Sequence, residues 1–157
     1  MGHSLGGLLA LAYAMERQSV FKTVILSAPA LGLSQKPFFL KVLFGRLFSY
    51  ILPKKGINSK LDITGISRDA KVVQEYKEDP LNHDQVSLYT ARVVLNLQKY
   101  FAKKGCTCAM PALLVHGTDD RLTSCSASKR FMRHLEGDNH RIITIDGAFH
   151  ERTPYPI

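Results

Sequence analysis

The stretch MGHSLGGLLALAYA, residues 1–14, decides how this chain folds. Within it, Gly2-His3-Ser4-Leu5-Gly6 matches the pattern G-x-S-x-G, in which a sharp turn between a strand and a helix lifts a serine oxygen clear of the backbone. The turn is so tight that side chains two residues before and two residues after the serine would collide, so we expect Gly2 and Gly6 to be required. Ser4 is therefore expected at the tip of this turn.

The residues after the turn favour a helix from Leu5 to Arg17. Ala10, Ala12 and Ala14 are strong helix formers, and the leucines among them form a broad apolar face. Only Met1 precedes the pattern, so we expect the turn to lack the strand that should lead into it and to follow a free terminus.

Three short apolar runs further along the chain are typical of buried parallel strands, and they lie at Lys22 to Ser27, Ala112 to His116 and Arg141 to Asp146. A helix from about Ser126 to Leu135, capped by Thr123-Ser124, separates the last two runs. This alternation of strands and helices predicts an α/β fold with a parallel sheet.

Residues 31–107 are too long for a loop in a compact domain, so we expect an insertion with structure of its own. Its first half contains an unusually apolar helix, Phe38 to Leu52. The small and basic residues of this helix share one narrow stripe: Lys41, Gly45, Arg46 and Ser49. Such a helix fits three roles, namely a lid over a hydrophobic pocket, a contact with a membrane surface, or a helix buried in the core. An ordinary amphipathic helix is expected near residues 88–101.

The composition is that of one ordinary globular domain. The 157 residues are 45% hydrophobic, which is enough to bury a core. The formal net charge of +8 is spread along the chain without a basic run interleaved with aromatic residues, so no nucleic-acid partner is expected. The chain begins without the pattern of a signal peptide, and no apolar run reaches membrane-spanning length. We therefore expect a cytoplasmic protein and leave peripheral membrane contact open.

Neither a metal site nor a cofactor is expected. Cys106 and Cys108 are separated by one residue, where zinc and thioredoxin-type sites need two. With Cys125 the cysteines are odd in number, which favours reduced thiols. No two histidines have the i, i+4 spacing of a zinc-binding helix.

Ser4 needs partners before it can act as a nucleophile, because a serine hydroxyl is weak at neutral pH. A histidine must take its proton, and a carboxylate must orient that histidine. In proteins with this serine turn, the acid and then the histidine follow on loops at the carboxyl ends of strands. Asp119 and Asp120 both follow the strand that ends at His116, and His150 follows the last strand. His150 is thus the expected base, and the residues alone leave two acids open.

The remaining histidines are read as surface or packing residues, which is the usual role of a histidine without special context. His3 adjoins Ser4 and His116 ends a strand, so both are expected beside the site without taking part in the chemistry. His83, His134 and His140 have no context that indicates a role.

Six motifs of the chain carry a family resemblance: Gly2-His3-Ser4-Leu5-Gly6-Gly7, Ser27-Ala28-Pro29, Ile66-Ser67-Arg68-Asp69, Asp79-Pro80-Leu81, His116-Gly117-Thr118-Asp119-Asp120-Arg121-Leu122 and Gly147-Ala148-Phe149-His150. Together they resemble monoacylglycerol lipase and its lysophospholipase-like relatives in the α/β-hydrolase superfamily. The resemblance implies a serine hydrolase that cleaves carboxylic esters of lipids, monoacylglycerol above all, through an acyl-enzyme and without a cofactor.

The resemblance also assigns residues to roles. The family's acid ends a glycine-x-x-aspartate motif, which here runs from Gly117 to Asp120, so Asp120 is selected as the acid of a triad with Ser4 and His150. The backbone N–H of Leu5 would supply one donor of the oxyanion hole. The Phe38 to Leu52 segment would belong to a mobile hydrophobic cap through which a lipid chain enters from a membrane.

The chain departs from that family before Ser4 and after His150. Family members carry further strands and a histidine-glycine loop, which supplies a second oxyanion donor, before the turn, and they carry a closing helix after the histidine. We therefore expect residues 1–157 to be one truncated α/β-hydrolase domain, the C-terminal part of the fold, with a helical cap insertion at 31–107. Its sheet would have about three strands and one edge whose backbone groups are unpaired. Met1 would then be an internal or mis-assigned start.

Two alternatives to a monoacylglycerol lipase stay open. The chain could be an inactive fragment whose cap binds a membrane or a protein partner. It could equally serve a lysophospholipase, thioesterase or peptidase of the same fold, because fold and triad do not fix the acyl acceptor.

Overall fold

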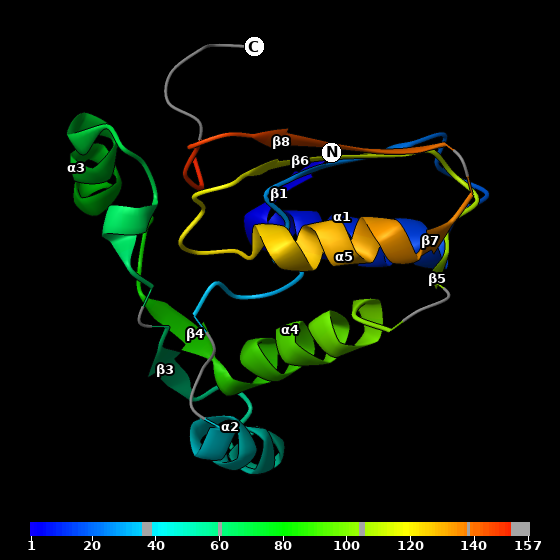
Figure 1. Cartoon of the computed structure of the whole chain (residues 1–157). Helices are drawn as coiled ribbons and strands as arrows, with labels where there is room; N and C mark the ends of the chain where they lie inside the picture. The colour runs from blue at the N-terminus through cyan, green and yellow to red at the C-terminus, as the bar shows by residue number, and fades with distance from the viewer. Residues whose placement is uncertain (36–38, 60, 104–105, 138, 152–157) are drawn as a thin grey trace.

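Four parallel strands form the central sheet of the computed structural model, which describes residues 1–35, 39–59, 61–103, 106–137 and 139–151 (Figure 1). The strands stand in the order β1-β2-β6-β8. Their bounds are Gly2–His3 for β1, Val24–Ser27 for β2, Ala112–Gly117 for β6 and His140–Ile145 for β8. The three apolar runs are therefore confirmed as strands, and the α/β class with a parallel sheet is confirmed with them.

The strand β1 corrects the expectation that the serine turn lacks a leading strand. Gly2 lies beside Leu26 and His3 lies beside Ser27 in parallel register, so two residues already form a ladder with β2. A run this short has no periodicity to read, which is why the sequence pattern did not reveal it.

Helices α1 (Ser4–Glu16) and α5 (Cys125–His134) lie against one face of the sheet, and α4 (Leu88–Phe101) lies beneath them (Figure 1). Both helices of the first layer agree with their predicted ranges to within about a residue at each end. The predicted cap of α5 is present, because the Ser124 hydroxyl accepts a hydrogen bond from the N–H of Ala127. The amphipathic helix expected near residues 88–101 is α4.

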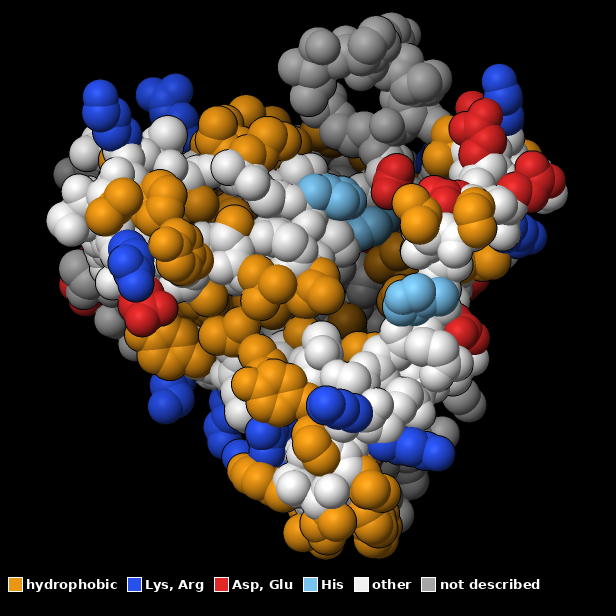
Figure 2. Space-filling view, turned by 180° about the vertical axis from the view of Figure 1, so that it is seen from behind, with side chains coloured by type: hydrophobic (Ala, Val, Ile, Leu, Met, Phe, Trp, Pro, Cys, Tyr) orange, Lys and Arg blue, Asp and Glu red, His pale blue; other side chains and the backbone are white. Residues whose placement is uncertain are grey.

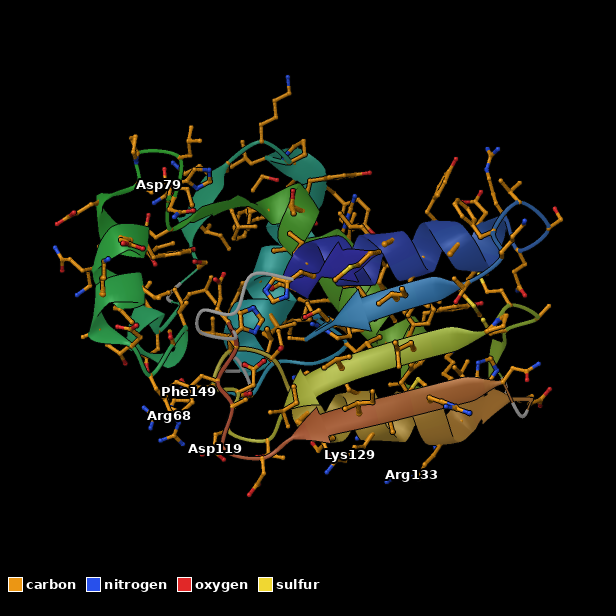
Figure 3. All side chains as sticks on the ribbon, turned by 90° about the horizontal axis from the view of Figure 1, so that it is seen from above. Arg68, Asp79, Asp119, Lys129, Arg133 and Phe149 are labelled. Carbon is orange, nitrogen blue, oxygen red and sulfur yellow. The ribbon has the colours of Figure 1, made fainter. Side chains whose placement is uncertain are left out.

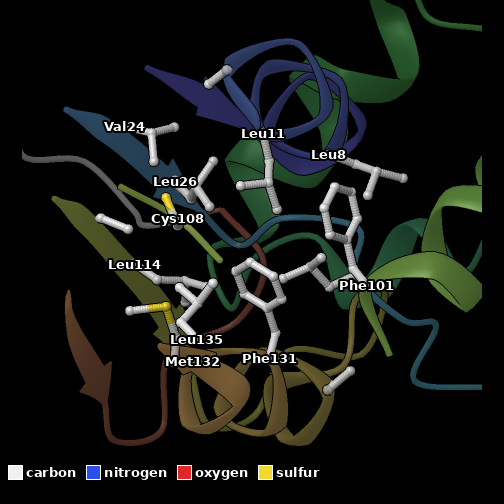
Figure 4. Packing of buried hydrophobic residues seen from close by; sticks show 14 of the residues in the cluster. Leu8, Leu11, Val24, Leu26, Phe101, Cys108, Leu114, Phe131, Met132 and Leu135 are labelled. Carbon is white, nitrogen blue, oxygen red and sulfur yellow. The ribbon is translucent and has the colours of Figure 1, made fainter. Parts of the chain in front are cut away.

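The core fills the space between the sheet and these helices (Figure 4). Leu8 and Leu11 of α1 and Leu26 and Leu114 of the sheet are completely buried. Phe101 of α4 meets Phe131 of α5 edge to face, with ring centroids 5.5 Å apart. This contact joins the insertion to the layer that carries the serine turn, so α4 belongs to the core.

Between β2 and β6 the chain leaves the sheet and forms the expected structured insertion. Its other elements are α2 (Phe39–Ile51), β3 (Gly56–Asn58), the 3-10 turn η1 (Ile63–Gly65), α3 (Ala70–Glu78) and β4 (Gln85–Ser87). The antiparallel pair β3 and β4 and the helix α3 were not predicted, because these segments are polar and short. A further short pair joins β5 (Cys106–Thr107) to β7 (Leu135–Glu136). Phe38, where the apolar helix was expected to begin, lies outside the described residues.

Helix α2 turns its small residues inward and its large apolar residues outward. Ser49 is buried and donates a hydrogen bond to the Arg46 carbonyl, and Gly45 lies opposite Leu88 of α4. The exposed large apolar side chains among the described residues of α2 are Leu43, Phe44, Leu47, Phe48, Tyr50 and Ile51. The interpretation of this segment as a buried core helix is therefore wrong. No helix in the described part of the chain is long and apolar enough to cross a membrane.

Candidate active site

Ser4 stands at the junction of β1 and α1, at the carboxyl end of the parallel sheet. Its backbone φ is 53°, in the left-handed region that a serine rarely adopts. The Ser4 carbonyl accepts a hydrogen bond from the N–H of Ala30, which ties the turn to the segment after β2. A strained residue held by its surroundings is typical of a functional turn, as the G-x-S-x-G pattern predicts.

The expected steric requirement holds for one of the two glycines of the turn and fails for the other. A Cβ atom on Gly2 would lie 2.6 Å from the Gly6 carbonyl oxygen, so the expectation of a steric requirement holds at Gly2. A Cβ atom on Gly6 would meet no described atom within 4 Å beyond its chain neighbours and the backbone of its own helix, so the steric reason given for Gly6 is wrong. The second crowded position is Gly7, where a Cβ atom would lie 3.1 Å from both the Gly2 carbonyl oxygen and the Pro29 side chain.

His150 lies between Ser4 and Asp120. Its Nε2 atom is 2.9 Å from Ser4 Oγ, and its Nδ1 atom is 2.7 Å from Asp120 Oδ2. Both distances are those of hydrogen bonds. The arrangement fits a serine hydroxyl that donates to Nε2 and an Nδ1–H group that donates to the carboxylate. The structure therefore brings together the side chains expected from the serine turn and from two loops.

Asp120 is buried and accepts hydrogen bonds on both carboxylate oxygens. The backbone N–H groups of Leu122 and Thr123 donate to Oδ1, each at 2.8 Å. The Thr123 hydroxyl donates to Oδ2 at 2.7 Å, and His116 Nε2 lies 3.2 Å from the same oxygen. This arrangement holds the carboxylate in one orientation relative to His150.

The surroundings of Asp120 favour its charged form. Burial alone raises the pKa of a carboxyl, but hydrogen bonds from His116, His150 and Thr123 outweigh it and hold the pKa of Asp120 well below its usual range. Asp120 is therefore ionised near neutral pH, which is the state that can orient a histidine and stabilise its cation.

Asp119 has a different environment. It is half exposed and its Oδ2 atom lies 2.6 Å from Arg68 Nη2, while its backbone N–H donates to the Ala148 carbonyl. Of the two acids that the residues alone left open, the structure places Asp120 against His150 and turns Asp119 towards Arg68.

Two further histidines adjoin the site, as expected. The ring centroid of His3 lies 4.8 Å from that of His150, and burial, with a smaller effect of His150, lowers the pKa of His3. His116 is buried, with Nδ1 2.9 Å from the Ser128 hydroxyl. Thr123 and His116 hold the acid, a role that the sequence did not indicate for either residue. The Asp-x-x-Thr spacing, typical of a carboxylate that caps a turn, is the signal that could have found Thr123.

The remaining histidines lie apart from this cluster in sequence and in the fold. His83 accepts a hydrogen bond from the Gln85 N–H in the insertion. His134 ends α5, and His140 begins β8, at the end of that strand opposite to the loop of His150. Among the described residues no three metal-binding side chains gather, and the thiols of Cys108 and Cys125 are free.

The backbone N–H of Leu5 lies in the first turn of α1. N–H groups there have no partner within the helix, and the helix dipole favours negative charge at this end. The side chain of His3, the N-cap residue of α1, accepts no hydrogen bond from these N–H groups. Leu5 is thus placed where it could donate to an oxygen that becomes negative next to Ser4 Oγ.

Comparison with known proteins identifies the family of the chain. Residues 1–153 match the family described as serine aminopeptidase, S33 (Hydrolase_4). Over 152 residues, the chain is 26% identical to monoacylglycerol lipase of Mycolicibacterium smegmatis and 28% identical to monoglyceride lipase of Rattus norvegicus. These matches cover 96% of this chain but 54% and 50% of the two relatives, so the chain spans about half their length.

Solved structures give the same result. The crystal structure of Paleococcus ferrophilus monoacylglycerol lipase matches with a TM-score of 0.89 and 32% identity, covering 96% of this chain and 58% of that one. A monoglyceride lipase from Saccharomyces cerevisiae matches in fold with a TM-score of 0.79 at 21% identity, over 95% of this chain and 55% of that one. The chain belongs to the Hydrolase_4 family of α/β-hydrolases, and it is similar to monoacylglycerol lipases over about half of their length.

Proposed function

We propose that this chain carries the catalytic triad of a serine hydrolase that cleaves carboxylic esters of lipids, with monoacylglycerol as the preferred substrate class. The observation that supports this most directly is the continuous chain of contacts from Ser4 Oγ through His150 to Asp120, at 2.9 and 2.7 Å. Contacts in this order suit proton transfer away from the serine as it attacks a carbonyl carbon.

The proposed reaction has two halves. Ser4 Oγ attacks the ester carbonyl while His150 takes the serine proton and Asp120 stabilises the resulting imidazolium. His150 then gives that proton to the leaving alcohol, which leaves an acyl group on Ser4. Water repeats the same steps on the acyl-enzyme and releases the fatty acid. The Leu5 N–H would stabilise the negative oxygen in each half, and one such donor is worth about a hundredfold or more in rate.

The lipid character of the substrate is supported by the exposed face of α2. Figure 2 shows hydrophobic side chains gathered at the end of the molecule that α2 forms, with Lys and Arg side chains beside them. Leu47 is 60% exposed and Ile51 is 70% exposed, and the exposed basic residues Arg46, Lys54 and Lys55 adjoin them in sequence. We propose that this face, with the 31–107 insertion as a cap, contacts the lipid surface from which the substrate is taken.

A substrate panel tests the proposed function. The chain and its Ser4→Ala variant are offered a long-chain monoacylglycerol, a lysophospholipid, an acyl thioester and an aminoacyl anilide. We expect release of fatty acid from the monoacylglycerol, and no release by Ser4→Ala. Faster turnover of another substrate in the panel would change the proposed substrate class but would still support the proposed triad. A folded chain that turns over nothing, yet still binds vesicles, would favour the inactive binding module instead.

A further inference from the structure

Arg68 lies between η1 and α3, where the insertion returns to the carboxyl end of the sheet. In Figure 3 it stands beside Asp119 and Phe149, which belong to the loops that follow β6 and β8. These two loops carry Asp120 and His150, so Arg68 is one of the places where the insertion meets the proposed catalytic loops.

The Arg68 guanidinium contacts both loops at once. Its Nε atom donates to the Gly147 carbonyl at 2.8 Å, and its Nη2 atom donates to Asp119 Oδ2 at 2.6 Å. The central carbon of the guanidinium lies 4.6 Å from the centroid of the Phe149 ring. A planar, delocalised cation can make these contacts together, whereas an ammonium group cannot.

The insertion also holds the chain directly after the histidine. The Glu151 N–H donates to the Ile66 carbonyl at 2.8 Å, two residues before Arg68. Phe149, directly before His150, lies against Arg68 and, at 4.8 Å, against Arg121. The residues on both sides of His150 are therefore fastened by the segment from Ile66 to Arg68.

Catalysis by His150 would require a fixed position of its imidazole. Its imidazole must stay within hydrogen-bond distance of two groups on different loops, although it sits beyond the end of an edge strand. A displacement of about 1 Å at such a group can lower a rate by about a hundredfold.

We propose that Arg68 is a positioning residue, which locks the loop of His150 to the insertion and so keeps the imidazole between Ser4 and Asp120. Arg68 touches none of the reacting atoms, and the proposal rests on the proposed function of the triad. The ion pair with Asp119 is a minor part, because its side chains are 60% and 49% exposed and such pairs contribute little. The carbonyl hydrogen bond and the ring contact carry the effect.

The kinetic test compares the wild-type chain with Arg68→Ala, Arg68→Lys and a control, Arg17→Ala. Arg17 lies against the Tyr13 ring at the far end of α1, so its loss removes a similar contact away from the site. The maximal rate of labelling by a fluorophosphonate is measured together with the half-saturating probe concentration. We expect Arg68→Ala to lower the maximal rate by about tenfold to a hundredfold with an unchanged half-saturating concentration, Arg68→Lys to recover part of it, and Arg17→Ala to match wild type. A wild-type rate in Arg68→Ala would overturn the proposal.

A second measurement reports on the contact between His150 and Asp120 without requiring turnover. The downfield proton resonance of the Nδ1–H group between His150 and Asp120 is recorded for wild type and Arg68→Ala, with thermal unfolding as the check that the variant is folded. We expect this resonance to broaden or vanish in Arg68→Ala and to persist in Arg17→Ala. If wild type is not labelled at all, the proposed function fails, and this resonance still decides the role of Arg68, because an unchanged signal would overturn it.

Discussion

Asp119 and Asp120 are neighbours in the sequence with opposite surroundings. Asp120 is buried among donors and faces His150, whereas Asp119 is half exposed and faces Arg68. A carboxylate that orients a catalytic histidine fixes the imidazole tautomer, while an exposed ion partner contributes little. The two positions therefore form a matched pair of sites for substitution.

We expect Asp120→Asn to lower the rate of Ser4 labelling by about 10⁴-fold, because the amide would favour the wrong imidazole tautomer. Asp119→Asn removes one exposed ion pair and should lower the rate by less than about tenfold. Labelling rates of both variants under one set of conditions check this. Equal rates for the two variants would show that Asp120 is not the acid.

Gly2 and Gly6 form a second matched pair. Gly2→Ala would place a Cβ atom 2.6 Å from a backbone oxygen, so we expect a loss of cooperative unfolding or a severe loss of stability. Gly6 lies within α1 and has open space around it among the described atoms. Gly6→Ala should therefore stabilise the chain by about 0.5–1 kcal/mol through helix propensity. Urea unfolding measures both, and destabilisation by Gly6→Ala would contradict the described packing.

At the scale of elements, α2 differs most from an ordinary surface helix. Its small residues pack against α4, and its large apolar residues point to solvent. The apolar pattern of Phe38 to Leu52 predicted the helix, but it could not give the direction of its faces. That direction depends on packing against α4, which is far away in the sequence and places Leu88 opposite Gly45.

A double variant, Leu47→Ser with Ile51→Ser, tests the proposed role of this face. Both side chains are largely exposed, so the free energy of unfolding should change by less than about 1 kcal/mol. Co-sedimentation with anionic vesicles should fall clearly, because the apolar area that would enter the lipid is reduced. Leu81→Ser serves as the control, since Leu81 is 84% exposed but lies outside α2. Unchanged vesicle binding by the double variant would contradict the contact.

The sequence predicted those elements that carry a strong local signal. Apolar runs such as Leu113-Leu114-Val115 are typical of buried strands in a parallel sheet. The serine turn is recognised by the spacing of its glycines around Ser4. The helix α3 and the two-residue strand β1 lack such a signal, because one is polar and the other depends on pairing with β2.

The site shows the same division. Ser4, His150 and the Asp119-Asp120 pair could be picked out because motif order places them at strand ends. Thr123 and Arg68 could not, because their roles depend on contacts made in three dimensions. Arg68 donates a hydrogen bond to Gly147, which is 79 positions away in the sequence, and no local sequence pattern predicts such a contact.

At the scale of the whole molecule, the four-stranded sheet, with α1 and α5 on one face, brings together residues that are far apart in the sequence. The contact between Ser4 and His150 joins positions 146 residues apart. The site therefore exists only while β1, β6 and β8 keep their places in the sheet, so its integrity reports on the whole fold.

Stability should accordingly depend on the charge of Asp120. The pKa of this group is lowered in the folded chain, below the value of about 3.9 expected when unfolded. The unfolded chain then binds more protons in acid, so this contribution is complete above pH of about 5 and is lost as the pH falls towards the folded-state pKa. We expect the difference in unfolding free energy between wild type and Asp120→Asn to shrink from pH 7 to pH of about 3, as measured by urea unfolding. A constant difference would contradict the lowered pKa.

The most direct test of the central claim is to locate the reactive serine. The 157-residue chain is treated with a fluorophosphonate and digested, and the adduct is found by peptide mass, with Ser4→Ala treated in parallel. We expect one adduct, on the peptide that contains Ser4, and none in the variant. A cooperatively folded chain that gives no adduct, or gives the same adduct when Ser4 is replaced, would show that the contacts from Ser4 through His150 to Asp120 do not form a working triad.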